Sequence, residues 1–133
     1  MTLHLTVAYL IGINLINIYN AIRFRKHKIF TSCDISIPLP QSTTLPHPVG
    51  IVVGHEVEIG KNVRIQQNVT IGRPEPDPEA GYPTIGDNVR IGAGSVVLGN
   101  IELNDGCVVG ANAVVVDDVS ANTTVVGAPA EEK

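Results

Sequence analysis

His47 is the residue whose type and setting best suit acid–base chemistry. It stands between Pro46 and Pro48, and an imidazole titrates near neutral pH. Such a base can take the proton of a hydroxyl group as it attacks an acyl carbon, which contributes roughly 10²–10⁴ in rate. Asp34 lies upstream and is the candidate carboxylate to orient the ring. A histidine buried in the core, or one that only sits in a turn, is the alternative interpretation of His47.

The cysteines and the other histidines suggest no second chemistry. Cys33 and Cys107 are too few for a disulfide scaffold, and neither has a histidine neighbour in the sequence. The four histidines, at positions 4, 27, 47 and 55, form no HxxxH pair, so we expect no metal centre. Two reduced thiols are typical of a cytoplasmic protein, and we expect that compartment.

The composition favours one β-rich domain. The chain has 133 residues and a net charge of −4, which argues against a general nucleic-acid-binding protein because such proteins are basic. It contains 15 Ile and 18 Val against 8 Leu, and these stiff β-branched side chains favour strands. We therefore expect an all-β domain with many short strands.

The first thirty residues differ from the rest. Residues 3–22 are almost uncharged, and a basic cluster follows at 23–28. The run is not a standard signal peptide, because no positive charge precedes its apolar stretch. Asn14, Asn17 and Asn20 recur every three residues, which indicates an amphipathic helix that packs on the domain or on a sister subunit. A helix that contacts a membrane through residues 3–28 and a frayed arm are the less favoured alternatives.

A six-residue period runs through the remainder, from Val53 onward. Each unit begins with an apolar residue and has a small or branched residue at its fifth position. Six residues make one short strand and a turn, and three units close a triangular coil whose strands stack in parallel. Head and fifth positions should point inward, with Gly and Asn at the corners. An antiparallel sandwich is the alternative, but it predicts period-2 alternation and uneven loops.

The period gives the domain organisation. Residues 1–32 are expected to form an N-terminal helical cap or arm, residues 33–130 the β-helix, and residues 131–133 a tail. Fourteen residues separate Ile71 from Ile85, which is not a multiple of six. The proline-rich stretch 73–84 must therefore protrude as a surface loop.

Several segments resemble the hexapeptide-repeat acyltransferases, specifically their serine O-acetyltransferase-like branch, which includes relatives from surface-polysaccharide pathways. The resemblance is carried by LPHPVGIVVG at 45–54, IQQNVTIG at 65–72, YPTIGDNVRIGAGSVVLGNIE at 82–102 and VVGAPA at 125–130. It implies a left-handed parallel β-helix, acetyl-CoA as co-substrate and a homotrimer with sites between subunits. The left hand comes from the resemblance, because periodicity alone does not give it.

The resemblance also implies roles for single residues. His47 matches the family's general base, and Asp34 matches its carboxylate partner, although the interval between them is about two residues short. Tyr82, before Pro83, stands where serine acetyltransferases have a second histidine. Backbone N–H groups near Gly72 could hold the oxyanion, and Arg73 or Arg90 could meet the phosphates of CoA. The groove for CoA should be lined by Gly92, Ala93, Gly94, Ser95, Ala111 and Ala113.

The predicted function is that of an acetyl-CoA-dependent O-acetyltransferase that acts on a small hydroxyl acceptor by direct transfer in a ternary complex. A sugar O-acetyltransferase of surface-polysaccharide synthesis is the nearest alternative. Tyr82 favours it, and we expect the best sugar to exceed serine in kcat/KM by at least about tenfold. A non-catalytic β-helix assembly module is the alternative of another class. A zinc enzyme would need three convergent imidazoles, and only His47 and His55 lie in the repeat region.

Overall fold

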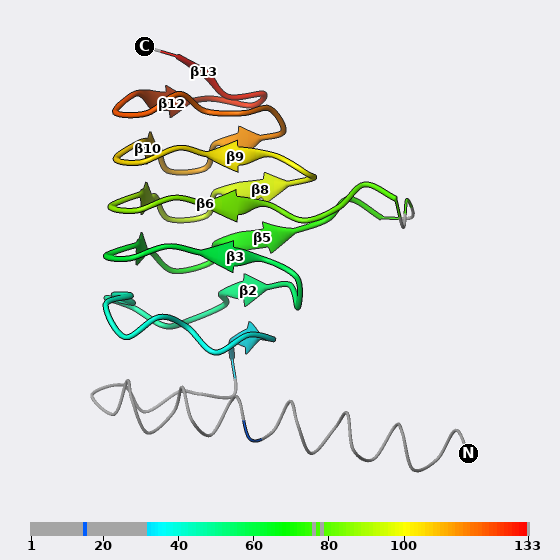
Figure 1. The fold of residues 1–133 in the computed structure, drawn as a ribbon, viewed down its shortest axis with the longest axis vertical. Helices are drawn as coiled ribbons and strands as arrows, with labels where there is room; N and C mark the ends of the chain where they lie inside the picture. The colour runs from blue at the N-terminus through cyan, green and yellow to red at the C-terminus, as the bar shows by residue number, and fades with distance from the viewer. Residues whose placement is uncertain (1–14, 16–31, 76, 78, 133) are drawn as a thin grey trace.

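The structure is a computed structural model that describes residue 15 and residues 32–75, 77 and 79–132. Successive coils stack on one another, and a full coil passes through strands of three faces of a triangular prism (Figure 1). Asp34 pairs in parallel with Val52, and Val52 pairs with Thr70, so one coil takes eighteen residues. The prediction of a parallel β-helix built from six-residue units is confirmed.

Each face of the prism is one sheet. Sheet A contains β1 (Asp34–Ile35), β2 (Val52–Val53), β5 (Thr70–Gly72), β8 (Val96–Leu98) and β11 (Val114–Val115). Sheet B contains β13 (Glu131–Glu132), β12 (Thr124–Val126), β10 (Val108–Val109), β7 (Arg90–Ile91) and β4 (Arg64–Ile65). Sheet C contains β3 (Glu58–Ile59), β6 (Thr84–Ile85) and β9 (Glu102–Leu103). β13, in the stretch expected to be a tail, pairs antiparallel with β12.

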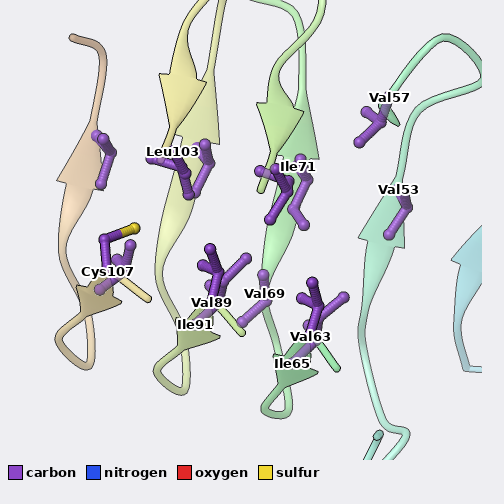
Figure 2. Close-up of a cluster of buried hydrophobic side chains, with 14 of the residues drawn as sticks. Val53, Val57, Val63, Ile65, Val69, Ile71, Val89, Ile91, Leu103 and Cys107 are labelled. Atoms are coloured by element: carbon purple, nitrogen blue, oxygen red, sulfur yellow. The ribbon is translucent and has the colours of Figure 1, made fainter. Parts of the chain in front are cut away.

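The core is a stack of inward-pointing, mostly branched side chains inside the prism, and side chains of successive coils lie over one another (Figure 2). All the fifth positions from Val57 to Val125 are buried, as the period predicts. Most head positions are buried too, but the period also makes Ala121 the head of the last unit, and there the prediction is wrong because Ala121 is exposed. The last coil is shorter there, since Val108 pairs with Thr124 after only sixteen residues.

The corners between the faces form the edges of the prism. We call the corners that lead from sheet B to sheet A the BA edge; they comprise residues 46–51, 66–69, 92–95 and 110–113. The corners that lead from sheet A to sheet C form the AC edge and comprise residues 54–57, 73–83 and 99–101. Asn68 and Asn112 on the BA edge have φ of 57° and 59°, and Gly50 and Gly94 have 63° and 70°. The predicted use of Asn and Gly at left-handed corners is confirmed.

The first coil begins earlier than the sequence period suggests, at Ile35 rather than Val53. Leu39, Leu45 and Ile51 are buried and fill its interior. On sheet B, Thr44 pairs with Arg64, which is twenty residues later in the chain. On sheet A, the paired residues before and after this bridge are only eighteen residues apart. The segment before Thr44 is therefore two residues short, and the corner after it, residues 46–51, has two residues more than the corner at 66–69.

The loop at 73–83 leaves the stack between β5 and β6 and projects away from the prism (Figure 1). Within it, the backbone N–H of Glu79 donates to a carboxylate oxygen of Asp77 at 2.9 Å. The loop starts and ends on the AC edge, so any side chain at its base lies beside that edge.

The predicted helix at residues 3–28 lies outside the described residues apart from Leu15, which is exposed. Among the residues that are described, the structure contains no helix with the length and apolar character needed to span a bilayer.

Candidate active site

His47 lies in the enlarged first corner of the BA edge. Its carbonyl accepts a hydrogen bond of 2.8 Å from the backbone N–H of Val49, so Pro48 occupies the centre of a three-residue turn. Pro48 is buried and anchors the corner, whereas His47 is exposed. The interpretation of His47 as a core histidine is therefore wrong. The two additional residues of this corner carry the imidazole out of the packed interior.

The BA edge places the corner of His47 in line with the segment predicted to form the CoA groove. Backbone hydrogen bonds join its successive corners: Asn68 donates to Val49, Gly94 to Gln67, and Asn112 to Ala93. Consecutive corners are separated by about 4.8 Å, the spacing of paired strands. His47 therefore lies at one end of a continuous edge that continues past Gly92, Ala93 and Gly94 to Ala111.

Two predicted groove residues face the wrong way. Ser95 and Ala113 are both 0% exposed, because each is the fifth residue of its unit and points into the prism. The Ser95 hydroxyl donates to the carbonyl of Gly92, which secures the corner from within. Their side chains therefore cannot line an outer groove. Ala93 is half-buried and Ala111 is exposed, so these two remain available on the outside.

Asp34 lies on β1, on the outer surface of sheet A, and is exposed. Its backbone N–H donates to the carbonyl of Ile51 at 2.8 Å, which fixes β1 beside β2. Within the described part of the chain, no hydrogen bond or ion pair joins the Asp34 carboxylate to the His47 ring. The structure therefore places both residues in the first coil, with no hydrogen bond or ion pair between their side chains.

Tyr82 lies at the base of the protruding loop on the AC edge, and its partner is His55. The tyrosine hydroxyl is 3.2 Å from Nδ1 of His55, and the two rings meet edge to face with centroids 5.1 Å apart. The Arg73 guanidinium carbon lies 5.8 Å from the centroid of the tyrosine ring. A Cβ on Gly54 would lie 2.9 Å from Cδ1 of Tyr82, so only glycine there leaves room for the ring. Gly72 is the last residue of β5 and directly precedes this edge.

Sheet A therefore separates the predicted site residues into two groups. His47 and the groove corners lie at the start of its strands, and Gly72, Arg73 and Tyr82 lie at their end. A strand of three residues spans roughly 10 Å, which is too far for one small acceptor to contact both groups across the face of a single chain.

Two polar residues near these groups were missed by sequence reasoning. His55 was considered only as a metal ligand; its contact with Tyr82 joins residues 27 positions apart through a loop of irregular length. Its Nε2 is also 3.8 Å from Glu56 Oε1. Gln67 lies on the BA edge, and its Oε1 is buried with no hydrogen-bond partner among the described residues. No sequence signal marks Gln67, because polar residues are common at corners.

The thiols do not supply a nucleophile. Cys107 is 0% exposed, and burial raises the pKa of its thiol to about 11. Burial also raises the pKa of Cys33. Both thiols are therefore protonated at neutral pH, and the thiolate is the reactive form.

Comparison with known proteins agrees with this architecture. The bacterial transferase hexapeptide (six repeats) family matches residues 82–117. A serine acetyltransferase of Staphylococcus epidermidis is 46% identical over 85 residues, which are 64% of this chain and 40% of that protein. The chain thus spans less than half the length of this curated relative.

Solved structures give the same result. Soybean serine acetyltransferase complexed with serine is 38% identical, with a TM-score of 0.68 over 86% of this chain and 47% of that one. Serine acetyltransferase of Brucella abortus in complex with coenzyme A is 31% identical, with a TM-score of 0.65 over 81% of this chain and 42% of that one. The fold is the left-handed parallel β-helix, and in both sequence and structure the chain is similar to serine acetyltransferases, with a hexapeptide-repeat match over residues 82–117.

Proposed function

We propose that this protein is an acetyl-CoA-dependent O-acetyltransferase with His47 as its general base. The neutral imidazole takes the proton of the acceptor hydroxyl while that oxygen attacks the thioester carbonyl. The tetrahedral intermediate then collapses, the bond from carbon to sulfur breaks, and the imidazolium returns the proton to the departing CoA thiolate. The acetyl ester and free CoA are the products. No covalent acyl-enzyme is required, which fits the protonated state of both thiols.

The arrangement of the BA edge carries this proposal. An exposed imidazole is mounted on a proline-anchored corner, and the small residues Gly92, Ala93 and Ala111 follow on the same edge. Small residues allow an extended pantetheine arm to approach the backbone closely. A thioester at the end of such an arm would lie beside His47. The solved relatives that contain coenzyme A support the choice of co-substrate.

L-Serine is the first candidate acceptor, because the named relatives are serine acetyltransferases and some solved ones contain serine. A sugar hydroxyl is the second, and Tyr82 favours it. An aromatic ring suits the apolar face of a sugar, and the Tyr82 hydroxyl with His55 offers hydrogen-bonding groups beside it.

A homotrimer is part of the proposal, since one chain holds the two groups of site residues on opposite edges of sheet A. A neighbouring copy could bring its AC edge to the BA edge of the first. The outer surface of sheet A supports such packing, because it carries an apolar row of Val52, Val96, Leu98, Val114 and Val116. The cytoplasm is the proposed compartment, because acetyl-CoA is available there.

The test is a CoA-release assay with acetyl-CoA and a panel of L-serine, L-homoserine and simple sugars. Release that depends on one acceptor class would support the transferase and identify its acceptor. A sugar that exceeds serine by at least about tenfold in kcat/KM would confirm the sequence prediction, and efficient serine turnover without sugar turnover would show it wrong. A chain that neither binds CoA nor releases it from acetyl-CoA would favour the non-catalytic assembly module.

A further inference from the structure

The three faces of the prism differ in the charge of their outward residues. Sheet A is apolar. Sheet C presents Glu58, Thr84 and Glu102. Sheet B presents Arg64 on β4 and Arg90 on β7, both exposed, so the cations of the regular coils are concentrated on one face. The resemblance implied a role for Arg90, as one of two residues that could meet the phosphates of CoA, but none for Arg64. Both arginines lie outside the two groups of site residues described above.

Arg64 and Arg90 are direct register partners in the parallel ladder between β4 and β7. Facing residues on neighbouring strands lie close together, and like charges in that position destabilise a sheet. In the part of the chain that the structure describes, neither guanidinium forms an ion pair with a carboxylate. The two cations are therefore held side by side, and their mutual repulsion destabilises the sheet. A bound anion would offset this repulsion.

A hollow of about 460 Å³ lies over this pair. Its lining comprises Arg64, Gln66, Arg90, Ile91, Gly92, Val108 and Val109, and contains no acidic residue. A volume of this size suits a small ligand. The apolar floor and the two guanidinium groups together favour an organic ligand that carries a phosphate over a simple metal cation or an apolar molecule.

The hollow reaches the BA edge through Gln66 and Gly92, which open the second and third corners of that edge. The corner with His47 is the first. Arg64 and Arg90 therefore lie about one and two strand spacings along the prism from the corner with the proposed base. A ligand that reacts beside His47 could place a phosphate in this hollow.

We propose that the hollow is a binding site for a phosphate-bearing group, which Arg64 and Arg90 hold from two adjacent coils. Guanidinium groups bind phosphate oxygens through paired N–H donors, which a lysine cannot reproduce. Two sources share this chemistry: the phosphates of CoA and a phosphate on the acceptor. Anion binding itself does not depend on the proposed function, whereas the assignment of its source does.

The experiment compares the full chain with Arg64→Gln/Arg90→Gln by calorimetric titration. The probes are CoA, acetyl-pantetheine, which lacks the phosphates, glucose 1-phosphate and glucose. Lys61→Gln is the control, since Lys61 is an exposed cation in a corner between sheets C and B, away from the hollow. Arg64→Lys/Arg90→Lys keeps the charge and removes the paired donors. Circular dichroism and sedimentation check the fold and the oligomeric state of each variant.

We expect the double Gln variant to bind at least one phosphate-bearing probe with a Kd about tenfold or more higher than that of the unsubstituted chain. Acetyl-pantetheine, glucose and the Lys61 control should be unaffected. If only CoA binds more weakly, the phosphates of CoA are the group that the hollow binds. If only glucose 1-phosphate binds more weakly, the hollow binds a phosphate of the acceptor. Equal binding of every probe to both proteins would overturn the site. A changed oligomeric state with unchanged phosphate binding would also overturn it and assign the arginines to a contact between copies.

These titrations need no turnover, so the two proposals can fail separately. A chain that binds phosphate through Arg64 and Arg90 but releases no CoA from acetyl-CoA would retain this site and lose the proposed activity. A chain that turns over acetyl-CoA equally well with and without both arginines, and binds phosphate equally, would retain the activity and lose the site.

Discussion

The hydroxyl of Tyr82 lies 3.2 Å from Nδ1 of His55, and this contact fixes the base of the protruding loop against the second coil. Tyr82 is partly buried against the core, so its ring is held by packing as well as by the hydrogen bond. Tyr82, which stands where the sequence resemblance implies a second histidine, therefore has a histidine of its own as partner.

Tyr82→Phe should lower kcat/KM for the acceptor by about tenfold while KM for acetyl-CoA changes little. The substitution keeps the ring but removes the hydroxyl, and one hydrogen bond contributes about 1–1.5 kcal/mol. Steady-state kinetics with the best acceptor from the panel would measure it. An unchanged kcat/KM would exclude a role for the hydroxyl in acceptor binding.

Gly54→Ala should lower both stability and acceptor turnover, because the new Cβ would collide with the Tyr82 ring. In the Tyr82→Ala background the same substitution should be much less damaging, since the colliding ring is gone. Urea unfolding of the unsubstituted protein, the two single variants and the double variant gives the coupling free energy between residues 54 and 82. Additive losses of unfolding free energy would contradict the predicted collision.

His47→Ala should reduce kcat by at least about 10² with little effect on CoA affinity, in line with loss of a general base. Thr44→Ala is a matched control, because Thr44 is an exposed residue of the same coil. Binding is measured by titration with CoA and turnover by CoA release. Near-normal turnover in a folded His47→Ala protein would remove His47 from the mechanism.

Asp34→Asn tests whether Asp34 acts as the carboxylate partner of His47 or only begins the first strand. If the Asp34 carboxylate orients the His47 ring during catalysis, Asp34→Asn should lower kcat at least tenfold. It should also shift the acidic limb of the profile of kcat against pH. A purely structural role should leave kcat and that limb unchanged, because Asn keeps the backbone bond from residue 34 to Ile51.

Cys107 should make stability depend on alkaline pH. Burial raises the pKa of its thiol from 9.0 to about 11, so the folded state holds the proton more tightly than the unfolded chain does. Its contribution is complete below pH 9 and is lost as pH rises from 9 to 11. The free energy of unfolding should therefore fall over this window, and less steeply in Cys107→Ala. Identical slopes would contradict the predicted shift.

Sheet A should be needed for assembly if the proposed trimer is correct. Val52→Asp/Val116→Asp places charges on two exposed valines of its outer surface and should convert trimers to monomers, with loss of CoA binding. Glu58→Gln/Glu102→Gln on sheet C is the control. Sedimentation at micromolar protein measures the state. A monomeric wild-type chain that binds CoA would contradict the prediction.

The six-residue period predicted most of the fold because each unit repeats the same burial requirement. Ile65, Ile71 and Ile91 recur at inward positions, and eighteen residues return the chain to its starting face. The predicted domain, residues 33–130, included the first coil, but the period is not visible in it because its segment before Thr44 is two residues short and its corner at 46–51 is two residues long. Those compensating changes hide the period and also place His47 outside.

The site was only partly predictable for related reasons. A shared edge for Gly92, Ala93 and Ala111 follows from the period, but His47 joins that edge only through the irregular corner at 46–51, which the period does not show. The inward orientation of Ser95 also follows from its fifth position, but the resemblance had assigned it to the groove. The contact between Tyr82 and His55 could not be derived, since the path of a proline-rich loop is set by packing at its base.

The antiparallel strand β13 has a consequence for assembly. A stack of parallel coils has an open end whose backbone donors and acceptors would accept another coil of the same kind, including one from another molecule. At that end of sheet B, β13 turns back and occupies the free side of β12 in the opposite direction. A reversed, highly charged strand, with Glu131 and Glu132, offers a poor template for a parallel coil. This strand therefore disfavours end-to-end polymerisation of the protein through sheet B.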